Sequence, residues 1–405
     1  MRLLVSFAAL FMSIILLQLS SGGVGSFDAI VGQTLGFTTG QIGLLGSAHF
    51  VGFFIGCWWA PRVISGVGPS RAFASFAALG AIGLLGHTLI THPLAWAVLR
   101  IASGLCIAAC YTVIEAWLQS KVTNETRGRA MGIYRMVDIG GSLMAQVMIG
   151  ALASVETYVA YNLLTLFCCA SLLPLALTST KPPETSRAPR LNPVLALTRS
   201  PLAVAGVTVA GISTASYRMM GPVYGANIGL TASEIGVFLA LFVAGGALAQ
   251  LPVGYLADKF DRRNILLVTS FMSVGACFFS ASVSGDTMVF VASFLFGFVT
   301  FPIFSIAAAH AHDFAASDER VELSAALIFY YAVGAIMAPL ISARVIDTFG
   351  PPAFFILIGA AHIALAIFGL LRIFKGRKAG QKTAYVYAPR TSFIIGRLMR
   401  RLRDR

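Results

Sequence analysis

The sequence predicts an all-α polytopic membrane protein with twelve transmembrane helices, arranged as two six-helix halves related by pseudo-symmetry. Three observations support this fold class: the composition, the alternation of charge between successive connections, and an internal repeat. Of the 405 residues, 57% are hydrophobic and only 11% are charged. A soluble domain carries about 25% charged residues. The chain is therefore expected to lie in a lipid bilayer.

Apolar blocks recur along the whole chain, each long enough to cross a hydrocarbon core of about 30 Å as a helix. The first block follows Arg2, and a cleaved signal peptide is the alternative interpretation of it. All six cysteines lie inside apolar blocks without an accompanying His or acidic cluster, which indicates buried thiols and no metal site. The expected spans are residues 3–31, 41–60, 72–90, 94–118, 128–152, 158–178, 203–225, 234–256, 265–283, 287–311, 322–346 and 352–374.

Lys and Arg are concentrated in alternate connections, such as those holding Arg62, Lys121 and Lys259, and in the basic tail. The remaining connections are short and almost free of basic residues. The positive-inside rule then predicts an inner or plasma membrane protein with both termini in the cytoplasm. Because the net charge of +13 follows this pattern, we expect no nucleic-acid partner. The chain has no Gly-x4-Gly-Lys-Ser/Thr motif, so ATP-driven pumping has no support and no cofactor is expected.

A short phrase occurs twice, as "GFTTGQIG" from Gly36 and as "GLTASEIG" from Gly229, 193 positions apart (229 − 36). Each copy precedes an expected span: Thr231 or Ser233, and more weakly Thr38 or Thr39, can cap the coming helix. A single shared offset over several spans indicates two halves descended from one unit. The same offset pairs Gly52 with Gly245, Gly104 with Gly297, Arg127 with Arg320, and Gly141 with Gly334.

The repeat and the polar segments define the expected domains: a first half over 1–178, a proline-rich cytoplasmic linker over 179–200, and a second half over 201–375. Residues 376–405 form a basic cytoplasmic tail. In this tail the apolar side chains between Ile395 and Leu402 fall on one helical face, which favours a segment lying on the anionic inner leaflet. A disordered tail is the alternative.

Two motifs give the chain a resemblance to the major facilitator superfamily (MFS). The connection after the eighth span reads Gly254-Tyr-Leu-Ala-Asp258, followed by the paired basic residues Arg262 and Arg263. The fourth span carries Arg100-Ile-Ala-Ser-Gly104, which resembles the intramembrane Arg-x-x-x-Gly of the family. The resemblance implies a secondary transporter that moves a small molecule by alternating access, with Arg100 in substrate or proton coupling.

Two departures from the family pattern argue against a specific assignment to drug export. The first-half loop around Arg62 has no aspartate, and the fifth span lacks the glycine–proline motif of many drug/proton antiporters. The phrases "GCWWAPRVI" and "YTVIEAWL", followed by "RGRAMG", are similar to the YcaD-like branch of the superfamily.

Several charges at the cytoplasmic side are candidates for gating. Asp258 ends a helix beside Gly254, where its carboxylate can pair with an arginine or accept from a neighbouring helix N-terminus. We expect this contact to act as a latch, although Arg262 and Arg263 also suit a solvated positive-inside loop. A second candidate is Glu115 with Arg135. Because the two residues lie at similar depth near the cytoplasmic ends of their spans, we expect a structural pair or a gate.

Four charged residues lie within expected spans, where an ionisable group is costly and therefore a functional candidate. Asp28 follows glycines and serines that predict a weak or broken helix, as in cavity-lining segments; a position at the outer mouth is the alternative. Arg218 lies beside an expected break at Gly221–Pro222, which suggests contact with an anionic group unless the side chain snorkels outward.

Arg100 and Asp138 occupy consecutive spans at depths that would allow an ion pair. Pairing would keep Asp138 ionised, whereas an unpaired Asp138 could carry a proton. A structural role for Arg100, bonded to carbonyl groups of a neighbouring helix, is the alternative.

The sequence thus predicts a secondary transporter, expected as a monomer, with a small-molecule substrate for which the arginines favour an anion, and with proton coupling. The alternative is a membrane assembly or binding protein that keeps this fold without transport. The sequence shows no nucleophile–base pair and no metal constellation of the kind an enzyme needs, so enzymatic activity is not expected.

Overall fold

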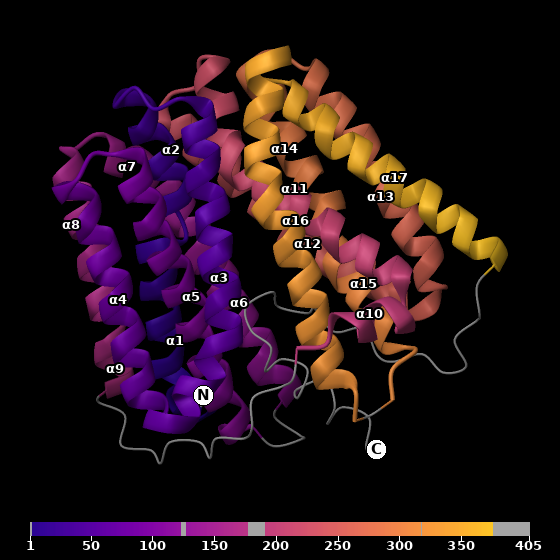
Figure 1. Cartoon of the computed structure of the whole chain (residues 1–405), viewed down its shortest axis with the longest axis horizontal. Coiled ribbons are helices and arrows are strands. Elements are labelled where there is room, and N and C mark those ends of the chain that lie inside the picture. Colours follow the sequence, from indigo (N-terminus) through magenta and orange to yellow (C-terminus); the bar gives the residue numbers. More distant parts are fainter. Residues whose placement is uncertain (1, 123–126, 177–190, 317, 376–405) are drawn as a thin grey trace. The chain divides into compact units, whose positions relative to one another are not determined.

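A computed structural model describes residues 2–122, 127–176, 191–316 and 318–375, and the regular structure in these ranges is helical (Figure 1). The helices fall into two compact units, α1–α9 and α10–α17. Among the described residues, eleven helical segments are long and apolar enough to span a membrane. The bent pair α10–α11 makes a twelfth when it counts as one span. The predicted all-α membrane fold is confirmed.

In the first unit, α1 and α2 belong to one span that is interrupted at Gly22 and Gly23. The weak helix predicted around Asp28 is therefore found as a break just before it. A Cβ at Gly23 would lie 2.7 Å from the carbonyl oxygen of Ala145, so the chain passes α6 too closely for a side chain. The helices of this unit are α1 (Arg2–Ser21), α2 (Val24–Thr34), α3 (Thr39–Val67), α4 (Pro69–Leu89), α5 (Pro93–Lys121), α6 (Arg127–Val147), α7 (Ile149–Ala153), α8 (Thr157–Ala170) and α9 (Leu172–Ala176).

The second unit differs from the sequence prediction in two places. The predicted linker over 179–200 is helical at its end, because Asn192 caps α10 by accepting from the Leu195 amide; the other residues of this linker up to 190, and the tail over 376–405, lie outside the described residues. The break predicted at Gly221–Pro222 is wrong, since α11 continues through Pro222. The helices are α10 (Pro193–Arg199), α11 (Pro201–Asn227), α12 (Ala232–Lys259), α13 (Arg262–Ser282), α14 (Asp286–Thr300), α15 (Ile303–His312), α16 (Arg320–Phe349) and α17 (Ala353–Lys375).

The helix starts repeat the 193-residue offset of the sequence. It separates the starts of α3 and α12 (232 − 39), α4 and α13 (262 − 69), α5 and α14 (286 − 93), and α6 and α16 (320 − 127). The caps repeat as well: Thr38 and Thr231 each form a capping box, with Gln41 and Glu234 respectively. The echoed phrase is thus a helix start that occurs at the same place in each unit.

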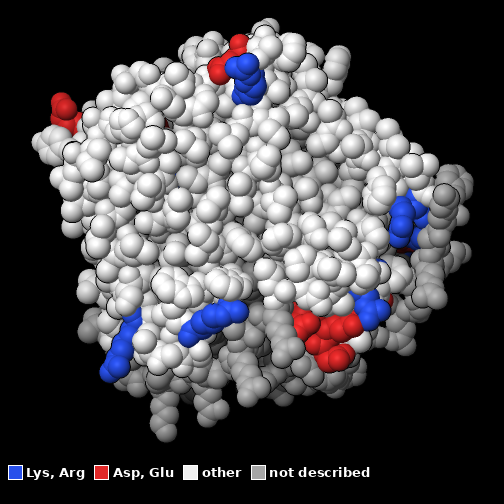
Figure 2. All heavy atoms as spheres, viewed as in Figure 1, with Lys and Arg blue, Asp and Glu red and all other residues white. Residues whose placement is uncertain are grey.

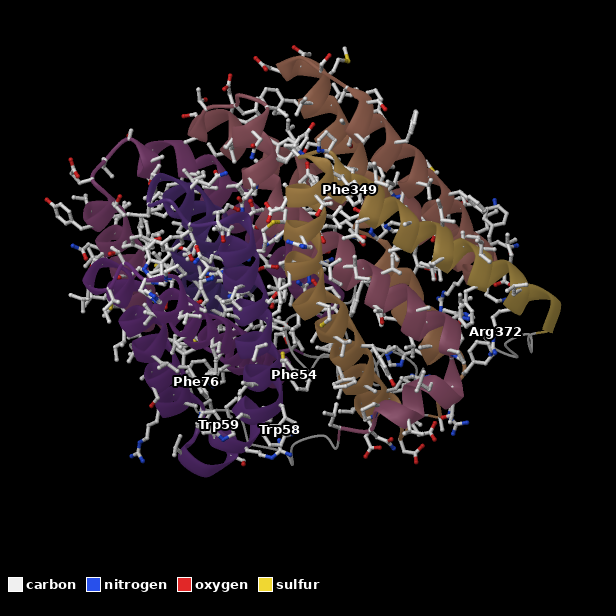
Figure 3. The ribbon with its side chains drawn as sticks, turned by 45° about the horizontal axis from the view of Figure 1, so that its top comes forward. Phe54, Trp58, Trp59, Phe76, Phe349 and Arg372 are labelled. Carbon is white, nitrogen blue, oxygen red and sulfur yellow. The ribbon has the colours of Figure 1, made fainter. Side chains whose placement is uncertain are left out.

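The described surface is largely apolar, as expected for contact with lipid. On the face drawn in Figure 2, uncharged side chains cover most of the surface. Large apolar side chains on the helices are exposed, among them Leu251 at 82% and Phe278 at 76%. In Figure 3, Trp58 and Trp59 lie at one end of α3, and both indoles are close to half exposed. Exposed indoles at a helix end are typical of the membrane–water interface.

Glycines hold α3 against α5 at backbone distance. A Cβ at Gly52 would lie 2.0 Å from the carbonyl oxygen of Ile101, and a Cβ at Gly104 would lie 2.0 Å from that of His49. Such distances exclude any side chain, so the two backbones touch directly. The contact is repeated between α12 and α14, where a Cβ at Gly245 or Gly297 would lie 2.0 Å from the Phe294 or Phe242 carbonyl oxygen, respectively.

We expect Gly52→Ala and Gly245→Ala each to lower the free energy of unfolding by about 1–3 kcal/mol or more, because the new methyl group meets a backbone carbonyl that must move. Chemical unfolding of the purified protein in detergent measures this effect. Gly140→Ala is the matched control: it is also helical, and no neighbouring atom lies within 4 Å of its Cβ position. This control should be neutral or stabilising by up to about 1 kcal/mol. Equal effects in all three variants would contradict the backbone-contact explanation.

Candidate functional site

Four polar side chains meet inside the first unit, and we call them the Asp28 cluster: Asp28, His87, Arg100 and Tyr161. They come from α2, α4, α5 and α8. Asp28 and Tyr161 are fully buried, and His87 and Arg100 are 1% and 2% exposed. An ion pair buried to this degree pays a large desolvation cost. The cluster is therefore the first candidate for a functional site.

Asp28 is the acceptor at the centre of the cluster. The Tyr161 hydroxyl donates to Asp28 Oδ1 at 2.6 Å. The other oxygen, Oδ2, lies 3.4 Å from Arg100 Nε and 3.6 Å from His87 Nε2. Arg100 approaches through Nε, so its two terminal nitrogens remain for a further acceptor. One carboxylate thus joins side chains from three other helices.

Aromatic rings surround the imidazole of His87 and fix its orientation. His87 stacks on Tyr161, with ring centroids 5.0 Å apart and planes at 17°, and the Trp96 ring lies 4.8 Å from it. His87 Nδ1 donates to the carbonyl oxygen of Gly83 at 2.7 Å. Trp96 is itself held by a hydrogen bond from its indole nitrogen to the Ile90 carbonyl oxygen at 2.8 Å. The imidazole is therefore held with Nε2 toward Asp28.

The Arg100–Asp138 pair that the sequence allowed is not formed, because Arg100 faces Asp28 and Asp138 has other partners. Tyr111 donates to Asp138 Oδ1 at 2.5 Å, and Gln18 Nε2 donates to the same oxygen at 2.7 Å. Arg135 Nη1 lies 3.3 Å from Oδ2. Asp28 and Asp138 thus belong to separate clusters, and each has its own arginine.

Glu115 and Arg135 lie in the same region as Asp138. Tyr134 donates to Glu115 at 2.9 Å, and the Arg135 guanidinium lies 4.6 Å from the centroid of the Tyr134 ring. Glu115 is fully buried and Arg135 is 9% exposed. The structure therefore brings together Glu115, Tyr134, Arg135 and Asp138, and a gating role for them stays a prediction.

In the second unit, Arg262 joins the ends of α12, α13 and α15. Its Nη1 donates to Asp313 at 2.7 Å and to the Ala309 carbonyl oxygen at 3.1 Å, and its Nη2 donates to Asp258 at 3.2 Å. Arg262 is 1% exposed, the Asp313 side chain 4% and the Asp258 side chain 50%. The expected Asp258 contact is thus found as a pair with Arg262, and the deeper partner is Asp313.

Arg263 is also paired, and so is not a solvated loop residue. It donates to both oxygens of Asp261, at 2.9 and 3.3 Å, and its side chain is 11% exposed. The hydrogen bonds from Arg263 hold the pKa of the Asp261 carboxyl below its usual range. Gly254 is buried on α12, one turn before Asp258.

The fourth predicted residue, Arg218, lies on α11 in a different setting. Its neighbour Tyr217 is fully buried and stacks on Phe238, Phe242 and Phe296. The interior here is aromatic, and Tyr217 packs within it. Arg218 itself is partly exposed, and an anion-binding role for it stays a prediction.

Sequence reasoning missed His87, Tyr161, Gln18 and Tyr111. Each stands alone in an apolar stretch, and only the packing of distant helices brings it to a carboxylate. Asp313 is likewise brought to its partner, Arg262, only by the fold, while the neighbouring His312 Nε2 lies 3.2 Å from the Ser324 hydroxyl.

The sequence is similar to those of bacterial proteins described as MFS-type transporters. An uncharacterized MFS-type transporter of Enterobacter sp. (strain 638) is 28% identical over 345 residues, which cover 85% of this chain and 88% of the relative. The uncharacterized MFS-type transporter YcaD of Escherichia coli O7:K1 is 28% identical over 325 residues, covering 80% and 84% respectively.

Solved structures agree on the fold. The nucleoside transporter NupG matches with a TM-score of 0.74 at 14% identity, over 93% of this chain and all of that one. A bacterial homologue of the human lysosomal transporter Spinster, in an inward-facing and occupied conformation, matches with a TM-score of 0.69 at 16% identity, over 90% and 94%. The sequence profile of the Major Facilitator Superfamily matches residues 10–228 and 202–403. The chain belongs to the Major Facilitator Superfamily and is an MFS-type transporter.

Proposed function

We propose that this transporter moves a small anionic molecule across the bacterial inner membrane by alternating access, coupled to protons. The observation that carries the proposal is the buried Asp28–Arg100 pair. A protein that only needed the fold could replace such a pair by apolar side chains at no cost, and often with a gain in stability. Retaining it inside a membrane segment is expected where the charges act on a substrate or ion.

The geometry of the pair supports a binding role. Among the described residues, Asp28 Oδ2, His87 Nε2 and Arg100 Nε have no partner at full hydrogen-bond geometry, although they face one another. Buried polar atoms in a purely structural network are normally satisfied. A guanidinium with two terminal nitrogens to spare suits a carboxylate or phosphate, which it can bind through two parallel hydrogen bonds. This favours an organic anion as substrate.

The Arg262 network supports the proposal that the second unit contains a gate. Alternating access needs contacts that hold in one state and break in another. Asp258 is half exposed and contacts Arg262 across one helical turn, so this contact can open at little cost in desolvation. Asp313 is buried and bonds the same guanidinium. We therefore propose that the Asp258–Arg262 contact breaks and forms during transport, whereas the Asp313–Arg262 contact is kept.

Transport by the Asp28 cluster predicts that Arg100→Gln abolishes anion flux. A thermal-shift screen of the purified protein against carboxylates, sugar phosphates and nucleotides provides the probe, and flux of the best ligand into liposomes is then measured. We expect Arg100→Gln to lower flux by about a hundredfold or more, because glutamine supplies neither the positive charge nor the planar fork with which Arg100 would bind the anion.

Arg344→Gln is the matched control, because Arg344 is an exposed arginine on α16 and should transport like the unaltered protein. Arg100→Lys keeps the charge but loses the planar fork, so an intermediate flux is expected. An Arg100→Gln variant that folds and transports normally would contradict the proposed function.

If Asp258 is the gate and Asp313 stabilises the fold, substitutions of these two partners of Arg262 should have different effects. Asp313→Asn should lower the unfolding free energy by about 3–5 kcal/mol, because it leaves a buried guanidinium without its closest counter-charge. Asp258→Asn should cost at most about 1 kcal/mol, as for an exposed pair, and yet should change the transport rate. Unfolding in detergent and liposome flux measure the two effects. If Asp258→Asn leaves the rate unchanged, Asp258 is not a gate.

A further inference from the structure

We propose that Asp28 and His87 together bind a single proton, and that this proton is the one coupled to transport. The first part concerns the cluster alone, whereas the coupling rests on the proposed function. The inference comes from the hydrogen-bonding roles that the surrounding groups impose on the two facing atoms, His87 Nε2 and Asp28 Oδ2.

The hydrogen bond at Nδ1 determines where the neutral imidazole carries its proton. A backbone carbonyl oxygen only accepts, so the 2.7 Å contact with Gly83 requires a hydrogen on Nδ1. A neutral imidazole with a hydrogen on Nδ1 has a lone pair on Nε2. The stacked ring of Tyr161 and the neighbouring Trp96 hold the imidazole in this orientation. In its neutral form, His87 therefore presents an acceptor to Asp28.

Asp28 presents an acceptor in return. Its Oδ1 is occupied by the Tyr161 hydroxyl, so Oδ2 is the oxygen that faces His87, at 3.6 Å. Without a further proton, a carboxylate oxygen and an imidazole lone pair oppose each other, and both are buried. Neither atom has a hydrogen-bond partner elsewhere in the described residues. One proton between them turns this mismatch into a hydrogen bond, whether it is written as protonated Asp28 or as the imidazolium of His87.

The neighbouring helices supply few other titratable groups. The groups that act on Asp28 are His87, Arg100 and Tyr161, from α4, α5 and α8. The long helix α3, which also packs on α2, contributes the imidazole of His49, whose ring packs against Phe50. Within the cluster, His87 Nε2 and Asp28 Oδ2 are the two buried atoms that face each other without a hydrogen-bond partner, so a proton bound here would join these two atoms.

Charge balance connects this proton to an anion. Without the proton, the charges of Arg100 and Asp28 cancel. With it, the cluster carries one net positive charge in a buried setting, which is costly unless a counter-charge is present. An anion on the terminal nitrogens of Arg100 would supply it. Proton and anion therefore favour each other's binding, and by thermodynamic linkage each raises the affinity for the other by the same factor.

The proton site is tested by nitrogen NMR on the full-length protein in lipid nanodiscs, with its six histidines labelled with ¹⁵N. The signal that disappears in His87→Gln identifies His87. We expect Nδ1 to be protonated throughout and Nε2 to change with pH between a hydrogen-bonded and an unprotonated form. Asp28→Asn should abolish that change, whereas His92→Gln, which removes an exposed histidine, should not. A Nε2 signal that stays in the form without a hydrogen bond at every pH from acid to neutral would overturn the proposal.

Coupling is tested with the anion identified by the thermal-shift screen. In liposomes, flux driven by a pH gradient is compared with exchange of labelled for unlabelled anion. In His87→Gln, the imidazole is replaced by an amide that donates to Asp28 but does not titrate. We therefore expect the ratio of pH-driven flux to exchange to fall about tenfold or more. An unchanged ratio would refute coupling at this pair. Absence of any flux in the unaltered protein would instead refute the proposed function, while the NMR result still decides the proton site.

Discussion

The direct backbone contact between α3 and α5 is the constraint on which the site depends. Gly52 meets the carbonyl oxygen of Ile101, the residue next to Arg100, and Gly104 meets that of His49 one turn further on. Because backbone atoms cannot yield as a flexible side chain can, α5 is fixed in depth and rotation against α3. The contact sets the depth of Arg100 independently of its ion pair with Asp28. In the proposed function, a ligand or proton can then weaken that ion pair while the two helices stay packed.

The two units share the same helix crossings but differ in the buried polar residues at corresponding positions. In the 193-residue register, Asp28, His87 and Arg100 correspond to Gly221, Ser280 and Ser293, all uncharged. There Ser293 accepts a hydrogen bond from Tyr217 at 2.6 Å, and Tyr217 lies in a stack of phenylalanine rings. The close α12–α14 contact through Gly245 and Gly297 is retained. The repeat therefore preserved the helix crossing and confined the buried charges at these positions to the first unit. In the second unit, the buried Arg262 instead forms its ion pairs at the ends of α12, α13 and α15.

The sequence predicted what local and periodic patterns determine, and missed what depends on helices meeting across long separations. Composition and repeat predicted the spans, and the glycines before Asp28 predicted the break between α1 and α2. The Arg100–Asp138 pair was inferred from consecutive spans, but α2 turns Asp28 toward Arg100, and Asp138 lies against Tyr111. His87 gave no signal because its role needs Gly83, Trp96 and Tyr161 around it. The break expected at Pro222 does not form, since helices within a membrane tolerate a proline when neighbours satisfy the freed carbonyl.

The loose geometry at Asp28 Oδ2 distinguishes the Asp28 cluster from the Arg262–Asp313 pair and supports the proposed binding role. At Asp313 the same chemistry, a buried carboxylate and an arginine, closes to 2.7 Å, and the guanidinium also donates to the Ala309 carbonyl oxygen and to Asp258. At Asp28 the arginine stops at 3.4 Å and the histidine at 3.6 Å, although the Tyr161 contact at 2.6 Å shows that close approach is possible there. A buried charge held at such distances lacks part of its compensation, and a proton or an anion can supply it. In the proposed function, the hydrogen bonds and charge compensation that the folded cluster lacks are made with the proton and the anion.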